Sequence, residues 1–133
     1  MSVFVDTSAL AAVIDAVDIN HASAQQQWND LIIRKEDLVC TNYILTECVA
    51  VIQRKIGIKA VRLLHEDITQ VLRIEWITHT AHSDSMNALL TASRRQLSLV
   101  DCTSFVTMRQ LGIKSAFAFD VHFTEQGFHC LPA

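Results

Sequence analysis

The 133-residue chain contains very little glycine and proline, with three Gly and one Pro. Flexible linkers and disordered segments are usually rich in these residues, so their scarcity predicts a compact chain made mostly of helices and strands. The length suits a single domain with one sizeable core, and we expect one domain over residues 1–133.

Long apolar runs and paired cysteines are also missing. No apolar run approaches the roughly 18 residues that span a bilayer, and no basic segment followed by an apolar run opens the chain, so we expect neither a membrane partner nor a secretory signal. The four cysteines form no C-x-x-C pair, which argues against the usual zinc sites. Their apolar neighbours predict reduced core thiols in a cytoplasmic protein, although two of them could still meet in space.

The chain has no excess of positive charge, because 11 Lys and Arg stand against 14 Asp and Glu. The net charge of −3 argues against a domain that holds nucleic acid by bulk positive charge. A local basic patch would still suffice for nucleic acid. The acidic balance also fits a protein that gathers carboxylates in one site.

What the sequence does contain is an alternation of short apolar runs and amphipathic segments. The expected strands are 3–5, 37–41, 71–77, 115–120 and 127–131, and the expected helices are 7–16, 18–35, 42–55, 58–70, 79–96 and 101–111. Strands separated by helices pair in parallel through right-handed crossovers. The predicted fold is therefore an α/β class, three-layer α/β/α sandwich on a parallel sheet of about five strands.

The same periodicity predicts which side chains point inward. Ile32 and Leu111 belong to the apolar stripes of their helices, and Trp76 lies on the face of its strand that also carries Leu72. Trp28 and Trp76 are expected in the core, or on a dimer surface if an apolar patch stays exposed.

Four acidic residues fall at the ends of predicted strands or near the starts of predicted helices: Asp6, Glu47, Asp101 and Asp120. Ligands of open parallel sheets bind beyond the carboxyl ends of the strands, near the point where strand order reverses. Taken singly, Asp6 and Asp101 could equally cap helices, and Asp120 could occupy a strand-end turn. Glu47 is harder to explain in this way, because its helical neighbours are mostly apolar and a buried carboxylate needs a partner.

Taken together, the four carboxylates indicate a metal site. Two carboxylates about 5 Å apart repel each other by roughly 3 kcal/mol at an effective dielectric constant of 20. A cluster of four must therefore share protons or hold a cation. Oxygen ligands alone favour a hard ion, Mg²⁺ or Mn²⁺, and such an ion activates water and neutralises a phosphodiester during hydrolysis.

Three segments carry a resemblance to a known family. "FVDTSAL" resembles the opening strand and first acid of the PIN-domain family, and "TNYILTECVAVIQRK" resembles its T-x-Y-x-x-x-E segment. "LSLVDCTSFVTMRQLGIKSAFAFDVHFTEQGF" is very similar to its carboxy-terminal signature. The similarity covers nearly the whole chain and is strongest to the VapC-type toxin ribonucleases.

This resemblance implies a fold, an activity and partners. The family fold has a parallel sheet in the order 3-2-1-4-5, and its four acidic metal-site positions fall on Asp6, Glu47, Asp101 and Asp120. The family's activity is Mg²⁺- or Mn²⁺-dependent endonucleolytic cleavage of RNA, and its toxins usually have a cognate antitoxin and commonly form a homodimer. Val100 stands where the family often has Thr or Ser, a departure that affects fine tuning more than activity.

Other polar residues near these positions could support such a site. Thr7 could orient the Asp6 carboxylate, and Thr103 and Ser104 could do the same for Asp101, although all three hydroxyls could simply belong to helix starts. Candidates for contact with RNA phosphates are Arg54, Lys55, Arg94, Arg95 and His122. The basic pairs could equally solvate helix ends, and His122 could approach either the substrate or the metal.

Two other functions remain open on sequence alone. A PIN-like protein could bind RNA or an antitoxin without cutting, although a retired site has no reason to keep four acids. A phosphatase could form an aspartyl-phosphate on Asp6, but such enzymes usually carry a second Asp two residues on, where this chain has Ser8.

Overall fold

The computed structural model of the protein describes residues 1–133 and contains one five-stranded sheet. All strand pairs are parallel and the order is β3-β2-β1-β4-β5, which confirms the predicted topology. The strands are β1 (Ser2–Val5), β2 (Asp37–Thr41), β3 (Leu72–Glu75), β4 (Ser115–Phe117) and β5 (His129–Leu131). The helices are α1 (Thr7–Ile14), α2 (His21–Ile33), α3 (Asn42–Lys55), α4 (Ile58–Glu66), α5 (His79–Ala92), α6 (Leu99–Leu111) and α7 (Val121–Glu125), with a 3₁₀ turn at Ile68–Val71.

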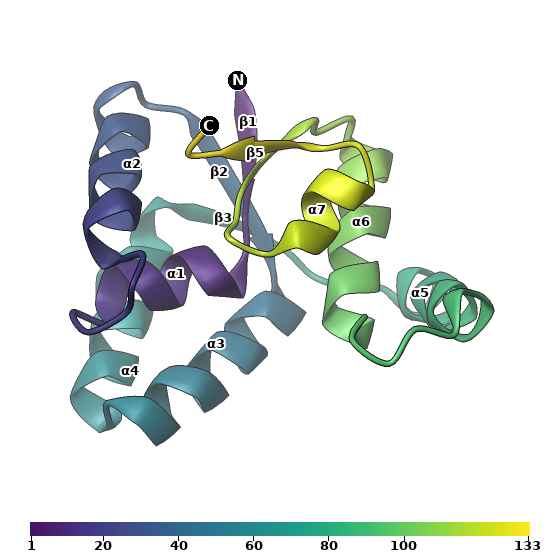
Figure 1. Ribbon diagram of the computed structural model, residues 1–133, viewed down its shortest axis with the longest axis horizontal. Coiled ribbons are helices and arrows are strands. Elements are labelled where there is room, and N and C mark those ends of the chain that lie inside the picture. Colours follow the sequence, from purple (N-terminus) through teal and green to yellow (C-terminus); the bar gives the residue numbers. More distant parts are fainter.

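The helices cover both faces of the sheet, as expected for a three-layer sandwich. Figure 1 shows α1, α2, α3 and α4 on one side and α5, α6 and α7 on the other. The chain changes sides after β3, because the next strand, β4, pairs with β1 at the opposite flank of the sheet. The strand order therefore reverses between β1 and β4, and ligands of this architecture bind at that point.

The core packs around the central strand β1. Val3, Phe4 and Val5 are fully buried, so this strand forms a continuous apolar run with neighbours on both faces. Phe4 packs against Phe123, whose ring lies edge-on to Phe105 with the centroids 5.1 Å apart. The four cysteines are free thiols, as predicted. No helix has both the length and the apolar composition needed to cross a membrane.

Several predicted boundaries were wrong. The strand expected at 115–120 ends at Phe117, and residues 121–125 form the short helix α7 that periodicity did not indicate. Helix α6 begins two residues earlier than expected because Ser98 caps it, whereas its end before Gly112, which adopts φ 68° as a left-handed cap, is as predicted. The helix expected at 58–70 ends at Glu66 and continues as a 3₁₀ turn.

Three side chains expected in the core are exposed. Strand β3 ends at Glu75, so Trp76 lies beyond the sheet and its residue is 74% exposed. Leu111 is the last residue of α6 and Ile32 lies in the last turn of α2, and both side chains are exposed at these helix ends. Trp28, in contrast, is partly buried and packs against the core.

Candidate active site

The four predicted carboxylates line one cleft at the carboxyl ends of β1 and β4. The cleft has a volume of about 510 Å³ and includes Asp6, Glu47, Asp101 and Asp120. They come from four different segments: the end of β1, the middle of α3, the first turn of α6 and the turn that follows β4. Sequence reasoning did not single out several other polar lining residues: Asp18, Asn20, Gln96 and Ser98.

Asp6 is the most buried member of the cluster, with 4% of its surface exposed. Its Oδ2 accepts hydrogen bonds from the Ser8 hydroxyl at 2.6 Å and the Ser8 backbone N–H at 3.2 Å. The Ser8 hydroxyl oxygen also accepts a hydrogen bond from Phe119 N–H, and Asp6 N–H donates to the Phe117 carbonyl, so the ends of β1 and β4 are fixed to each other. Ser8, rather than Thr7, therefore orients this carboxylate.

Burial raises the pKa of Asp6 to about 7. The two hydrogen bonds from Ser8 oppose this rise, and the negative charges of Asp101 and Asp120 add to it. Without a cation, part of the Asp6 population is therefore protonated at neutral pH.

Asp101 lies in the first turn of α6, where it takes part in the capping box that Ser98 begins, and it also faces the cleft. Ser98 N–H donates to Asp101 Oδ2 at 3.1 Å, and Asp101 N–H donates to the Ser98 hydroxyl oxygen at 3.0 Å, which together form a capping box. Burial raises the pKa of Asp101, and the nearby Asp120 raises it further. The capping role considered as an alternative thus coexists with a place in the carboxylate cluster.

Glu47 is half-buried on α3 and faces the same cleft. Burial raises its pKa, a hydrogen bond from the Thr7 side chain opposes the rise, and the charges of Asp101 and Asp120 add to it. The Thr7 hydroxyl also donates a hydrogen bond to the Ile44 carbonyl oxygen, at 3.4 Å. Thr7 therefore connects α1 to α3 instead of supporting Asp6.

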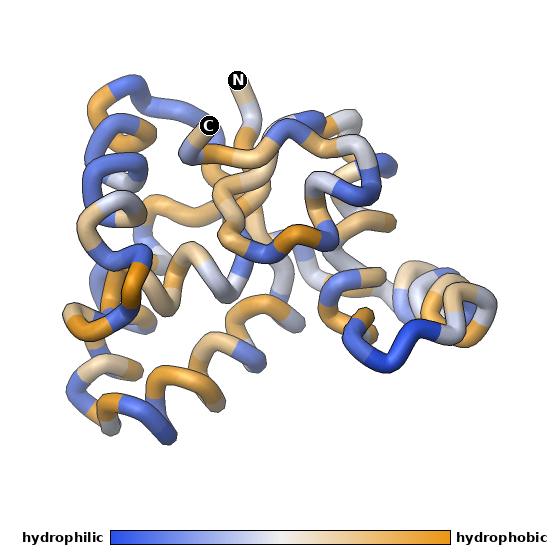
Figure 2. Tube along the Cα trace, in the orientation of Figure 1, coloured by the Kyte–Doolittle hydropathy of each residue, from blue (hydrophilic) through white to orange (hydrophobic).

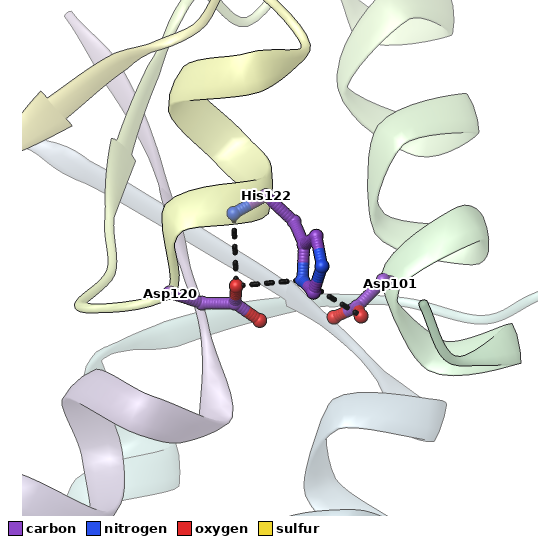
Figure 3. Close-up of side chains that lie close together, drawn as sticks. All are labelled: Asp101, Asp120 and His122. Atoms are coloured by element: carbon purple, nitrogen blue, oxygen red, sulfur yellow. Dashed lines mark hydrogen bonds and ion pairs between the residues drawn. The ribbon is translucent and has the colours of Figure 1, made fainter. Parts of the chain in front are cut away.

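Asp120 follows β4 and caps α7, because its Oδ1 accepts a hydrogen bond from His122 N–H at 2.9 Å. The His122 ring lies between two carboxylates, with Nδ1 2.8 Å from Asp120 Oδ1 and 3.6 Å from Asp101 Oδ2 (Figure 3). The ligand atoms of these three residues all lie within 4.8 Å of one another. His122 is thus part of the cluster rather than a residue at its edge.

No lysine or arginine neutralises the cluster. The ion pairs of the protein join Arg34, Arg62, Arg73, Arg94 and the N-terminus to other carboxylates, and His122 is the only basic side chain paired with the four acids. Asp101, Asp120 and His122 lie close enough to share one ion, and the charges of Asp101 and Asp120 also act on Asp6 and Glu47. Acids gathered in this way without a counter-charge favour a bound cation. The donor set, carboxylate oxygens with one imidazole nitrogen, fits Mg²⁺ or Mn²⁺.

The other predicted residues are distributed unevenly around the site. Lys55 lines the cleft, whereas Arg54 and Arg95 are exposed outside its lining. Arg94 forms an ion pair with Glu125, with Nη1 2.7 Å from Oε2. Arg94 and Arg95 belong to the connection between α5 and α6. Figure 2 shows that this connection is strongly hydrophilic.

Two hydroxyls expected to support Asp101 do not reach it. The Thr103 and Ser104 hydroxyls both donate to the Val100 carbonyl, at 2.7 Å and 3.0 Å, and are buried within α6. This prediction was wrong because hydroxyls in a helix interior bond preferentially to a carbonyl one turn back. Ser98 holds Asp101 instead. The sequence did not identify Ser98 as the helix cap, because it did not show where the helix begins.

Comparison with known proteins gives one family and several relatives. The PIN domain family matches residues 3–128. The 23S rRNA-specific endonuclease VapC20 of Mycobacterium tuberculosis is 35% identical over 128 residues, which cover 95% of each chain. Its crystal structure, described as that of a sarcin–ricin loop cleaving toxin, has a TM-score of 0.86 at 32% identity and covers 95% of both chains.

More distant solved structures share the fold alone. FitAcB from Neisseria gonorrhoeae has a TM-score of 0.68 at 14% identity and covers 98% of this chain and 96% of its own. VapBC2 from Rickettsia felis, bound to a DNA fragment from its promoter, has a TM-score of 0.70 at 10% identity. The match covers 98% of this chain and 97% of the VapBC2 chain.

Proposed function

Since this chain belongs to the PIN-domain family, we propose that it is an endoribonuclease that hydrolyses phosphodiester bonds of RNA with the help of a divalent metal ion. The observation that supports this most strongly is the cluster of four carboxylates that share a cleft and form no ion pair with any Lys or Arg. The complete set also favours a nuclease over a PIN-like protein that binds without cutting, because a protein that only binds would be more stable without these acids.

Asp6, Asp101 and Asp120 would hold Mg²⁺ or Mn²⁺, with Glu47 as a further ligand or as the general base. Bound there, the ion would supply positive charge for the phosphodiester and lower the pKa of a coordinated water. The protein positions these acids through its own hydrogen bonds, with Ser8 fixing Asp6 and Ser98 fixing Asp101.

Glu47 is suited to take the proton from the attacking water. Its pKa is raised by burial, which brings its basicity closer to neutral pH, where proton transfer is most effective. Lys55, on the same helix, is the one cationic side chain that lines the cleft and would bind a phosphate of the RNA backbone. Arg54, Arg94 and Arg95 would contribute phosphate contacts only outside the cleft.

For the substrate, we propose the sarcin–ricin loop of 23S ribosomal RNA. The support is the relative VapC20, which is named as specific for 23S rRNA and described as a toxin that cleaves this loop, and which matches the chain over 95% of its length.

For partners, we propose a cognate antitoxin protein and a homodimer, in the cytoplasm where ribosomes are found. The rim of the cleft next to Asp18 carries two strongly exposed apolar side chains, Val17 at 90% and Ile19 at 97%. Apolar side chains exposed this far suit a surface that another protein covers. Coexpression with the product of a small reading frame next to this gene, where one is found, should yield a complex that does not cleave RNA.

The nuclease is tested on intact ribosomes and on a synthetic sarcin–ricin loop, incubated with Mn²⁺, with Mg²⁺ or with EDTA. Primer extension should map one cut in the loop that requires the metal. Asp101→Asn should abolish the cut, whereas Asp84→Asn, which alters an exposed acid on α5, should leave it unchanged. Equal cleavage by wild type and Asp101→Asn would remove the proposed function.

A further inference from the structure

His122 is the one nitrogen donor in a cluster of oxygen donors. Its side chain is 11% exposed, and its Nδ1 atom is buried and forms no hydrogen bond. His122 lies in the first turn of α7, and its backbone N–H donates a hydrogen bond to Asp120 Oδ1. This hydrogen bond holds the His122 backbone beside the Asp120 carboxylate, which the imidazole also approaches.

The distances around Nδ1 match those between ligands of one metal ion. Ligand atoms that each lie about 2.0–2.2 Å from a divalent ion are on the order of 3–3.5 Å from one another. The distances from Nδ1 to the Asp120 and Asp101 oxygens, 2.8 Å and 3.6 Å, lie just below and just above this range.

A protonated imidazole is the alternative occupant of the same space, because it could neutralise both acids by itself. Such a ring would donate its Nδ1–H to Asp120, which is close enough to accept it, yet Nδ1 makes no hydrogen bond. A cation seated between the two atoms would contact both of them without the ring N–H having to point at the oxygen.

We propose that His122 Nδ1 is a ligand of the metal ion, beside Asp101 and Asp120, and that this nitrogen makes the site prefer Mn²⁺ to Mg²⁺. Imidazole binds transition metals well, whereas Mg²⁺ is held almost entirely by oxygen. The inference rests on the proposed function, because it concerns the ion of the same cleft, and it adds a ligand outside the four acids.

The test is pulsed electron paramagnetic resonance of the full-length protein loaded with MnCl₂, together with titrations of MnCl₂ and MgCl₂ by calorimetry. A directly bound imidazole gives nitrogen hyperfine coupling, which a purely structural histidine does not. The variants are His122→Asn, which keeps a polar atom near the position of Nδ1, and His122→Ala, which removes it. His65→Asn, at an exposed site on α4, is the matched control.

Wild type and His65→Asn should show the nitrogen coupling, and both His122 variants should lose it. Mn²⁺ affinity should fall about tenfold in His122→Asn, the lower end of what a disturbed metal environment costs, whereas its Mg²⁺ affinity should stay nearly unchanged. Circular dichroism confirms that each variant is folded.

Two results would overturn the inference: Mn²⁺ bound to wild type without nitrogen coupling, or coupling that persists in His122→Asn. If Mn²⁺-dependent cleavage of the RNA survives alongside either result, only the role of His122 fails and the proposed function stands. If wild type binds neither Mn²⁺ nor Mg²⁺, both fail together.

Discussion

Replacing Asp6 with asparagine should stabilise the metal-free protein at neutral and alkaline pH. The pKa of Asp6 is raised from 3.8 to about 7, chiefly by burial, so the folded protein keeps a proton that the unfolded chain has already lost. Between these two pH values the folded state binds more protons than the unfolded state, and stability therefore falls as pH rises. Above pH 7 the destabilisation is complete, and below pH 3.8 it is absent.

The size of this effect follows from the shift itself. About three pKa units at 1.36 kcal/mol each correspond to about 4 kcal/mol at pH 8, and the smaller interval from 3.8 to 5 corresponds to about 1.5 kcal/mol at pH 5. An asparagine side chain in place of Asp6 would be neutral at every pH and could still accept both hydrogen bonds from Ser8. The Asp6→Asn variant should therefore gain stability over wild type, and the gain should grow by about 2–3 kcal/mol between pH 5 and pH 8.

Urea unfolding in the presence of EDTA at several pH values measures this difference. Asp84→Asn, at an exposed site, serves as the control and should follow wild type at every pH. Adding Mn²⁺ should reverse the order, because the ion stabilises wild type by binding only its folded state. Curves for Asp6→Asn and wild type that run parallel from pH 5 to pH 8 would refute the claim that Asp6 is buried without a counter-charge.

Three further substitutions test neighbouring parts of the site. Asp101→Asn should raise the melting temperature of the metal-free protein, because its free energy of unfolding rises by up to the roughly 3 kcal/mol that close carboxylates cost. It should also shrink the rise in melting temperature on adding Mn²⁺, and melts without either change would mean that the acids do not interact. Glu47→Gln should slow single-turnover RNA cleavage about 10²–10⁴-fold and leave Mn²⁺ binding nearly intact, whereas cleavage at the wild-type rate would exclude Glu47 as the base. Ser8→Ala should destabilise the protein by about 1–3 kcal/mol in urea, because Phe119 N–H loses its acceptor; an unchanged unfolding midpoint would show that this hydrogen bond contributes nothing.

The parallel sheet could be predicted from sequence because the first three strands are short apolar runs that are each followed by a helix, whereas the strand order 3-2-1-4-5 was implied by the resemblance to the PIN-domain family. Once the sheet is parallel, every strand ends at the same edge, so acids that follow strands must meet there. This is why Asp6 and Asp120 could be placed in one site from a sequence in which they lie far apart.

Helix α7 and its consequences could not be predicted in the same way. Five residues are too short to show a helical period, and the Asp120 cap that starts the helix fits the end of a strand equally well. Without α7, His122 could be named as a candidate but not placed between Asp101 and Asp120. The support of Asp6 by Ser8 depends on a hydrogen bond from Phe119, which lies 111 residues further along the chain than Ser8, and no local pattern predicts such a contact.

The central claim is that separate acids meet in this cleft because a divalent ion neutralises them there. Crystals soaked in MnCl₂ and measured for anomalous scattering test it directly. We expect a strong anomalous peak in the cleft, in contact with Asp6, Asp101 and Asp120. A map with no peak there, or with manganese bound only elsewhere on the protein, would contradict it.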